Sequence, residues 1–149
     1  MQLTTQYRLI VRQVALANVV RMLRVPGVAD LLVRGAAAAE ETDMRVLLAD
    51  LITGASQLWT AWASDSRSPM AVCLTHISDS DGRFVCVSML AGKDVRRWAR
   101  VLEAAIAEFA RTENCQSVRF AGKRGWLRIL PTYKFIGIER GHSVFERML

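Results

Sequence analysis

The sequence has no long uninterrupted apolar run. None of its apolar stretches approaches the length needed to cross a bilayer, so we expect no membrane span and no membrane partner. The first 25 residues also lack a charged leader followed by a clean apolar core, because Arg8, Arg12 and Arg21 interrupt the apolar side chains. No internal repeat and no low-complexity linker is present. These absences predict one domain over residues 1–149 that stays in the cytoplasm or wherever its assembly takes it.

Cysteine is scarce. The three cysteines, Cys73, Cys86 and Cys115, are widely spaced, and an odd number without a leader does not indicate a disulfide framework. Cys73 and His76 lie three residues apart, but no second close pair of metal ligands follows and His142 is far away. The sequence therefore predicts no metal site, and small buried thiols instead.

Lysine is also scarce, and arginine supplies most of a formal net charge of +6. The basic residues gather in two stretches, 93–100 and 119–128. Arginine can bind a phosphate or a carboxylate through two N–H groups at once. Such a surface suits a phosphate-bearing small ligand, an acidic protein partner or nucleic acid. A solvated helix face is the simpler interpretation.

Apolar residues are plentiful, at 52% of the chain, so a packed core is expected. The N-terminal region, residues 1–43, should be mainly helical. A short extended segment at residues 7–11 precedes helical spacing up to the Pro26–Gly27 break. Residues 28–34 suit another helical turn, and residues 35–42 a loop or a weak helix.

A helix over residues 44–53 is predicted next, with Thr42 or Asp43 as its N-cap and Gly54 just past its end. The side chains expected on its buried face are Val46, Leu47, Leu48, Leu51 and Ile52. Three strands follow, at residues 57–63, 70–77 and 83–90. Short turns join them, which predicts an antiparallel meander with the third strand central, because both of its faces are apolar.

The clearest helix spans residues 95–111, with Asp94 as its expected N-cap. Its predicted buried stripe consists of Val95, Trp98, Leu102, Ala105, Ile106 and Phe109. A strand at residues 116–121 leads into a basic joint bracketed by Gly122 and Gly125. A short helix begins at Trp126 and stops at Pro131, and strands at 134–139 and 143–148 close an α/β (α+β) domain.

This order of elements resembles the GNAT superfamily of N-acetyltransferases, and more narrowly the small GNAT-like proteins encoded by bacteriophages. The motifs that carry the likeness are QLW at 57–59, the strand at 72–77, the segment 92–98, and GKRGWLRIL at 122–130 with Phe135 after it. The likeness covers roughly residues 44–149. It implies a mixed, mainly antiparallel central sheet flanked by helices.

The resemblance implies acetyl-CoA as cofactor, with its pyrophosphate on backbone N–H groups before the long helix. The residues that it assigns to this role are Leu90, Ala91, Gly92, Lys93, Arg96 and Arg97. Only Gly92 matches the family's loop. Met89 stands where Gln or Arg is usual, and Asp94 stands where a small residue is usual and places a carboxylate beside the phosphates unless it caps the helix.

The resemblance also implies a catalytic acid and a base. Many family members have a tyrosine five residues before a phenylalanine, but here that position is Leu130, and Tyr133 is the nearby phenol. A packing role is the simpler interpretation of Tyr133. His76 is the candidate base, because its strand faces the cleft in this fold. The other base candidates are Glu103, Asp79 and His142.

Two functions remain open. One is an acyl-CoA-dependent N-acyltransferase of phage origin that modifies a host or phage amine. The other is a non-catalytic virion or assembly protein, which the altered phosphate loop and the missing tyrosine favour. The expected partner is a protein of host or phage, or further copies of the chain, with nucleic acid as an alternative. The protein would lie in the host cytoplasm, or in the virion if it is structural.

Overall fold

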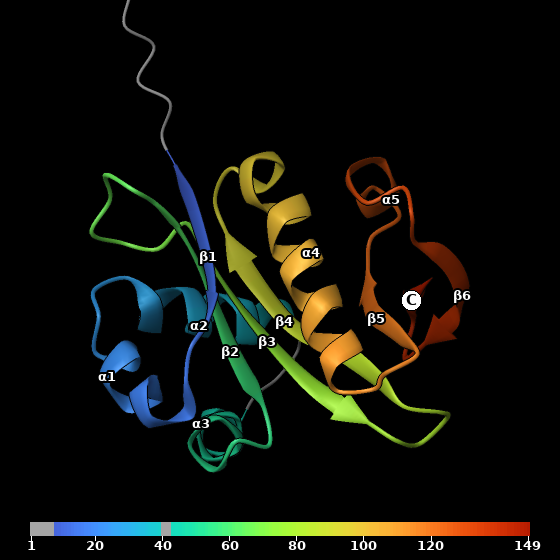
Figure 1. Ribbon diagram of the computed structural model, residues 1–149, viewed down its shortest axis with the longest axis horizontal. Coiled ribbons are helices and arrows are strands. Elements are labelled where there is room, and N and C mark those ends of the chain that lie inside the picture. The colour runs from blue at the N-terminus through green and yellow to red at the C-terminus, as the bar shows by residue number, and fades with distance from the viewer. Residues whose placement is uncertain (1–7, 40–42) are drawn as a thin grey trace, which may run out of the picture.

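The computed structural model describes residues 8–39 and 43–149, and a sheet of seven strands organises it (Figure 1). The strands are β1 (Leu9–Gln13), β2 (Gln57–Ala63), β3 (Ala71–Ser78), β4 (Phe84–Gly92), β5 (Ser117–Gly122), β6 (Lys134–Glu139) and β7 (His142–Met148). Their order in the sheet is β1-β2-β3-β4-β5-β7-β6, and only β4 and β5 are parallel neighbours. The predicted mixed, mainly antiparallel sheet is confirmed, with β4 at its centre.

Helices cover both faces of this sheet. They are α1 (Val19–Leu23), α2 (Val28–Ala38), α3 (Met44–Thr53), α4 (Val95–Thr112) and α5 (Trp126–Ile129), with a 3-10 turn at Leu16–Asn18. The side chains of α4 and α5 pack on one face, here called the α4 face, and those of α1, α2 and α3 pack on the other, the α2 face (Figure 1). No helix among the described residues has both the length and the apolarity of a membrane span.

The N-terminal region contributes a strand to the sheet, because β1 pairs along β2. The extended start is confirmed from Leu9 onward, and Tyr7 lies outside the described residues. The single helix expected up to Pro26 is wrong, since a 3-10 turn and the short α1 take its place. Helix α2 continues through the alanines to Ala38, where a loop or weak helix was expected. Alanine is the best helix former, which accounts for this extension.

Helix α3 has the predicted bounds and signals. The Asp43 carboxylate accepts a hydrogen bond from the Arg45 N–H at 3.0 Å, and Gly54 ends the helix at φ 84°. Thr42 lies outside the described residues. The predicted buried face is too wide, because Val46 and Ile52 are each 52% exposed. Leu47 and Leu51, one turn apart, carry the burial, since a short helix against a flat sheet buries a narrow stripe.

Helix α4 carries most of the core on its face of the sheet. Trp98, Leu102 and Ile106 are buried as predicted, against strand residues that include Cys73 and Val118. The other predicted members of the stripe, Val95, Ala105 and Phe109, are partly buried beside that core. The 3.6-residue period therefore identified the correct face of α4.

Strand β4 contains one irregular residue. Leu74 of β3 pairs with Met89, and the next residue, Thr75, pairs with Val87, so Ser88 is an extra residue in β4. Side chains alternate along a strand, and an inserted residue shifts that alternation. Val87 accordingly packs on the α4 face, whereas Met89 packs in the core of the α2 face.

The sheet opens beyond this bulge. The parallel ladder between β4 and β5 ends at the pair Val87 and Phe120. Strand β4 then continues to Gly92 alongside β3, and β5 continues to Gly122 alongside β7. The two central strands therefore separate, and helices α4 and α5 begin next to the separated ends.

Candidate active site

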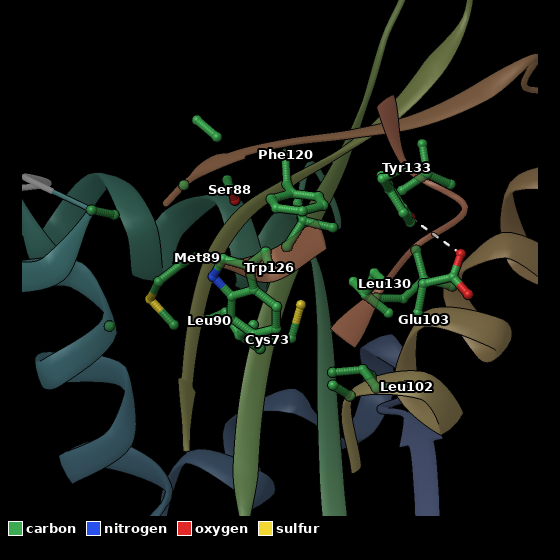
Figure 2. Close-up of a pocket in the computed structure, with 18 of the residues that line it drawn as sticks. Cys73, Ser88, Met89, Leu90, Leu102, Glu103, Phe120, Trp126, Leu130 and Tyr133 are labelled. Carbon is green, nitrogen blue, oxygen red and sulfur yellow. Dashed lines mark hydrogen bonds between the residues drawn. The ribbon is translucent and has the colours of Figure 1, made fainter. Parts of the chain in front are cut away.

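A cavity of about 310 Å³ occupies the opening between β4 and β5. Its lining comes from β3, β4, β5, α2, α4 and α5. Leu90 of β4, Phe120 of β5, Leu102 of α4 and Trp126 of α5 represent four of them (Figure 2). Most of the lining is apolar, and Ser88, Lys123, Glu103 and Tyr133 are the lining residues with polar side chains. Such a space suits a slender chain with few polar atoms. We call it the first cavity.

Trp126 lies at the centre of this cavity because of the glycine-bracketed joint (Figure 2). The edge of the indole packs on Gly122, where an added Cβ would lie 3.2 Å from the indole Cδ1. The ring also meets Phe120 edge to face, with ring centroids 6.1 Å apart. The joint is therefore the expected connection from strand to helix, and it also forms one wall of the cavity.

Tyr133 is 4% exposed at the cavity wall and belongs to a buried network. Its hydroxyl donates to Glu103 Oε1 at 3.2 Å, and Arg147 Nη1 donates to the same oxygen at 2.5 Å. Burial and the Glu103 carboxylate raise the pKa of Tyr133 far above its usual range, so the phenol keeps its proton. Leu130, at the family's tyrosine position, lines the same cavity with an apolar side chain.

The loop before α4 departs from a phosphate cradle. Gly92 is the last residue of β4, and a Cβ there would lie 2.6 Å from the carbonyl oxygen of Met70. The Lys93 N–H donates to that same oxygen at 2.9 Å, and the Lys93 carbonyl accepts from the Trp98 indole at 2.6 Å. Close packing on β3 therefore explains this glycine, and the Lys93 amide is already hydrogen-bonded.

Asp94 occupies the N-cap position of α4 as predicted, but its side chain does not cap the helix. Its backbone is left-handed, at φ 55° and ψ 50°, and its side chain makes no capping hydrogen bond. An N-cap residue needs an extended backbone for its side chain to reach the amides of the first turn. The exposed Asp94 carboxylate therefore stays at the start of α4, where it opposes an anion.

The predicted cofactor residues divide between three places. Leu90 lines the first cavity, whereas Ala91 packs beside the core of the α2 face. Lys93, Arg96 and Arg97 are exposed at the start of α4, whose residues Trp98 and Ala99 line the cavity. Lys123 adds a cation from the joint. Side-chain charge, and not a backbone cradle, is what the chain offers to phosphates.

A second cavity, of about 380 Å³, lies between α3 and strands β3 and β4. It shares Ser88 and Met89 with the first cavity, and its polar lining includes Asp50 of α3 and His76 of β3. Burial lowers the pKa of His76, which the Asp50 carboxylate partly opposes, so the imidazole is neutral at pH 7.

The structure does not bring His76 and Tyr133 together. His76 lines the second cavity and Tyr133 the first. Of the other base candidates, Glu103 lies in the first cavity, in the network with Tyr133. Asp79 pairs with Arg83 at 3.3 Å in the turn after β3, and His142 opens β7. Neither Asp79 nor His142 lines either cavity.

Three lining residues could not be recognised from the sequence. Ser88 sits in an apolar strand, Asp50 is one polar residue in an apolar helix, and Trp126 reads as part of a short helix's apolar side. A single polar residue in each segment is the only signal for Ser88 and Asp50. Within residues 8–39 and 43–149, no three His, Cys, Asp or Glu side chains converge where they could hold a metal ion.

Comparison with known proteins places the fold. No protein-family model and no curated protein matches the sequence. A probable acetyltransferase from Staphylococcus epidermidis matches 95% of this chain and 99% of its own, with a TM-score of 0.69 and 11% identity. A GNAT family acetyltransferase from Elizabethkingia anophelis with acetyl-CoA bound matches 95% and 98%, with a TM-score of 0.63 and 10% identity.

A PaiA N-acetyltransferase from Thermoplasma acidophilum, in complex with coenzyme A, matches 95% of this chain and 99% of its own. Its TM-score is 0.60 and its identity 7%. The chain therefore has the GNAT fold, and identities this low show the fold alone.

Proposed function

We propose that the protein binds an acyl-CoA, acetyl-CoA in the first instance, and transfers the acyl group to an amine. The observation that supports this proposal most directly is the apolar first cavity in the opening between β4 and β5, with cations beside it. Three solved proteins among those of this fold contain acetyl-CoA or coenzyme A. The bound cofactor supplies an acyl group activated as a thioester.

The residues of the first cavity fit the slender arm of this cofactor. Leu90 and Phe120 form apolar walls on the separated strands, and Trp126 closes the cavity on the side of α5. These side chains exclude water from the arm, which strengthens every polar contact made inside. A cavity of about 310 Å³ lies at the lower end of the range for small-ligand sites.

The phosphates would be held by exposed side chains. Lys93, Arg96 and Lys123 stand near the cavity, whereas the Lys93 amide is hydrogen-bonded to Met70 and the Asp94 carboxylate opposes the phosphates. Exposed charge pairs are screened by salt. We therefore expect an affinity that falls as the salt concentration rises.

We expect the acid–base chemistry to be carried out by residues near the bulge at Ser88. Leu130 cannot donate a proton, and the Tyr133 hydroxyl is already bonded to Glu103. The polar groups nearest the shared wall are the Ser88 hydroxyl and the neutral His76 imidazole. We assign to His76 the role of accepting a proton from the acceptor amine.

Titration calorimetry with acetyl-CoA and CoA tests the proposal. We expect micromolar binding that Arg96→Glu and Lys123→Glu each weaken about tenfold, since a contact to a charged group contributes about 1.5–3 kcal/mol. Arg67→Glu, an equal charge change in the exposed loop after β2, is the control and should bind normally. Gly92→Glu is unsuitable, because its side chain would collide with Met70 and damage the sheet.

A second candidate function is a phage-encoded, non-catalytic virion or assembly protein that uses this fold to bind another protein. The hydrogen-bonded Lys93 amide and the apolar Leu130 favour it. So do Ile136 and Ile138, 46% and 71% exposed on the outermost strand β6. Absence of any heat with millimolar acetyl-CoA would contradict the acyltransferase and favour this function, which mass spectrometry of purified virions would then test.

A further inference from the structure

The second cavity has the opposite charge to the rest of the protein. The chain carries 20 Lys and Arg residues against 14 Asp and Glu. Among the described residues that line this cavity, none is Lys or Arg, and the one charged side chain is Asp50. The cavity is therefore a small acidic site in a basic protein, which favours a cationic ligand.

The Asp50 carboxylate is available to such a ligand. Its backbone carbonyl accepts hydrogen bonds from Thr53 and Ser56, but no described Lys or Arg forms an ion pair with its side chain. His76 lines the same cavity, and the Asp50 carboxylate acts on it electrostatically. A carboxylate facing a neutral imidazole lacks a counter-ion, and a ligand ammonium would supply one.

The apolar residues that line the second cavity indicate which kind of chain carries the ligand's positive charge. Leu47, Leu74 and Met89 line this cavity with apolar side chains from the core of the α2 face. They suit an alkyl stem and offer nothing to a sugar, a nucleobase or an acidic group. The ligand class is therefore an alkylamine that carries a positive charge.

The position of the cavity indicates a second nitrogen. Ser88 and Met89 line both cavities, so a group that reaches them from the second cavity approaches the inner wall of the first. Asp50 lies on α3, away from this shared wall. A ligand that contacts both needs a cation at one end and a reactive amine at the other.

We propose that the second cavity is the acceptor site and binds an alkyl diamine, with one ammonium paired to Asp50 and the other nitrogen beside Ser88 and His76. The role of the diamine as acyl acceptor rests on the proposed acyltransferase function. The diamine-binding site itself is argued from the lining of the second cavity alone. His76 and Ser88 orient the nitrogen that faces the first cavity, and Asp50 selects the charge at the far end.

Three ligands with the same four-carbon stem test it: 1,4-diaminobutane, butylamine and 4-aminobutanoate. Each is titrated by calorimetry into the full chain without cofactor. The single ammonium of butylamine pairs with Asp50 and leaves no nitrogen for Ser88 and His76, so we expect the diamine to bind about tenfold more tightly, a difference of about 1.4 kcal/mol. 4-Aminobutanoate, whose ammonium can also pair with Asp50, brings a carboxylate beside Ser88 and His76 and should bind no better than butylamine.

Asp50→Asn keeps the shape of the side chain and removes its charge. In this variant both the diamine and butylamine should bind about tenfold more weakly, while Asp65→Asn in the exposed loop after β2 keeps the wild-type affinities. Ala55→Trp, which fills the cavity from its exposed rim, should abolish binding of all three ligands. Circular dichroism of each variant establishes that it is folded.

Two results would overturn the inference. One is equal affinity for the diamine and butylamine in the wild-type chain, and the other is an unchanged affinity for both amines in Asp50→Asn. A parallel titration with acetyl-CoA separates this failure from that of the proposed function. Acetyl-CoA binding without amine discrimination contradicts the diamine site alone, whereas diamine binding without acetyl-CoA binding supports the site and contradicts the acyltransferase.

Discussion

The two cavities share the lining residues Ser88 and Met89 but differ in whether the carboxylate in their lining has a cationic partner. In the first cavity the carboxylate of Glu103, which is 13% exposed, is paired with Arg147 and bonded to Tyr133, and exposed cations such as Lys93 and Arg96 lie at the start of α4. In the second cavity no described Lys or Arg lines the space around the half-buried Asp50. The difference teaches that a charge at a cavity wall can serve the fold when it is paired, whereas an unpaired charge is available to a ligand. The bulge of β4 lets one short segment serve both.

The largest effect should come from Met89→Asp. Met89 is 4% exposed in the core of the α2 face and lines both cavities. The substitution buries a charge among the apolar side chains of that core, which is strongly destabilising. We expect the variant to be insoluble or unfolded by circular dichroism.

Ser88→Ala, one residue earlier, is the control for that substitution. It keeps the extra residue and removes only the hydrogen bond from the serine hydroxyl to the Leu74 carbonyl, of 3.3 Å. The expected loss in free energy of unfolding is about 1 kcal/mol. A well-folded Met89→Asp variant would contradict the burial of Met89 in this core.

Arg147→Ala should have the next largest effect. It strands the Glu103 carboxylate, which is 13% exposed, without its counter-ion. Removing one partner of a buried ion pair costs about 3–5 kcal/mol, and the exposed fraction of this pair places the expected loss near the lower end.

Asp50→Asn leaves no cation without its partner, so its free energy of unfolding should change by less than about 0.5 kcal/mol. Urea unfolding measures both, and equal losses would contradict the contrast between the cavities.

Two tryptophan substitutions should separate binding at the two cavities. Leu90→Trp adds bulk to the first cavity, and Ala55→Trp adds it to the second. We expect the first to weaken CoA binding at least about tenfold and to spare diamine binding, and the second to do the reverse. Loss of both ligands in either variant would show that the two cavities do not bind independently.

The smallest expected effect is the pH dependence from His76. Its folded pKa is lowered by burial, so below the unfolded pKa of about 6.5 the unfolded chain takes up a proton more readily. Stability is therefore fully present above that pH and is lost as the pH falls through the folded pKa. The groups that face His76 are Asp50 from α3, which opposes the shift, and Cys86, its pair on β4.

His76→Gln should remove this part of the pH dependence, by less than about 1 kcal/mol between pH 7.5 and 5.5 in urea unfolding. Titration of the two histidine C–H signals by NMR provides the direct comparison. A pKa for His76 above that of a free histidine would contradict the burial argument.

The elements of the fold were largely predictable from the sequence. The predicted strands lie within two residues of β2 to β7, and α3 has the predicted ends. Alternation, helical spacing and glycines at turns are local signals, so they are legible without the fold. The insertion of β7 between β5 and β6 was not predicted, because strand order is a property of the assembled sheet.

The candidate site was much less predictable. Asp94 has the residue type of an N-cap, but its left-handed backbone prevents capping. Gly92 has the residue type of a phosphate loop, but the close approach of β3 explains it. In both cases the residue type suggested one role, and the backbone conformation or packing around the residue gave it a different one.

By itself the sequence determined the α/β class, the antiparallel meander, the buried stripe of α4 and the excess of basic charge. Only the tertiary structure decided that Ser88 is an extra residue, that β4 and β5 separate, and that Asp50 meets His76 while Tyr133 meets Glu103. The physical reason is the separation along the sequence between the residues that interact. Local periodicity depends on neighbours a few residues apart, whereas the pairs Asp50–His76, Glu103–Tyr133 and Glu103–Arg147 are separated by 26, 30 and 44 positions and meet only when the sheet assembles.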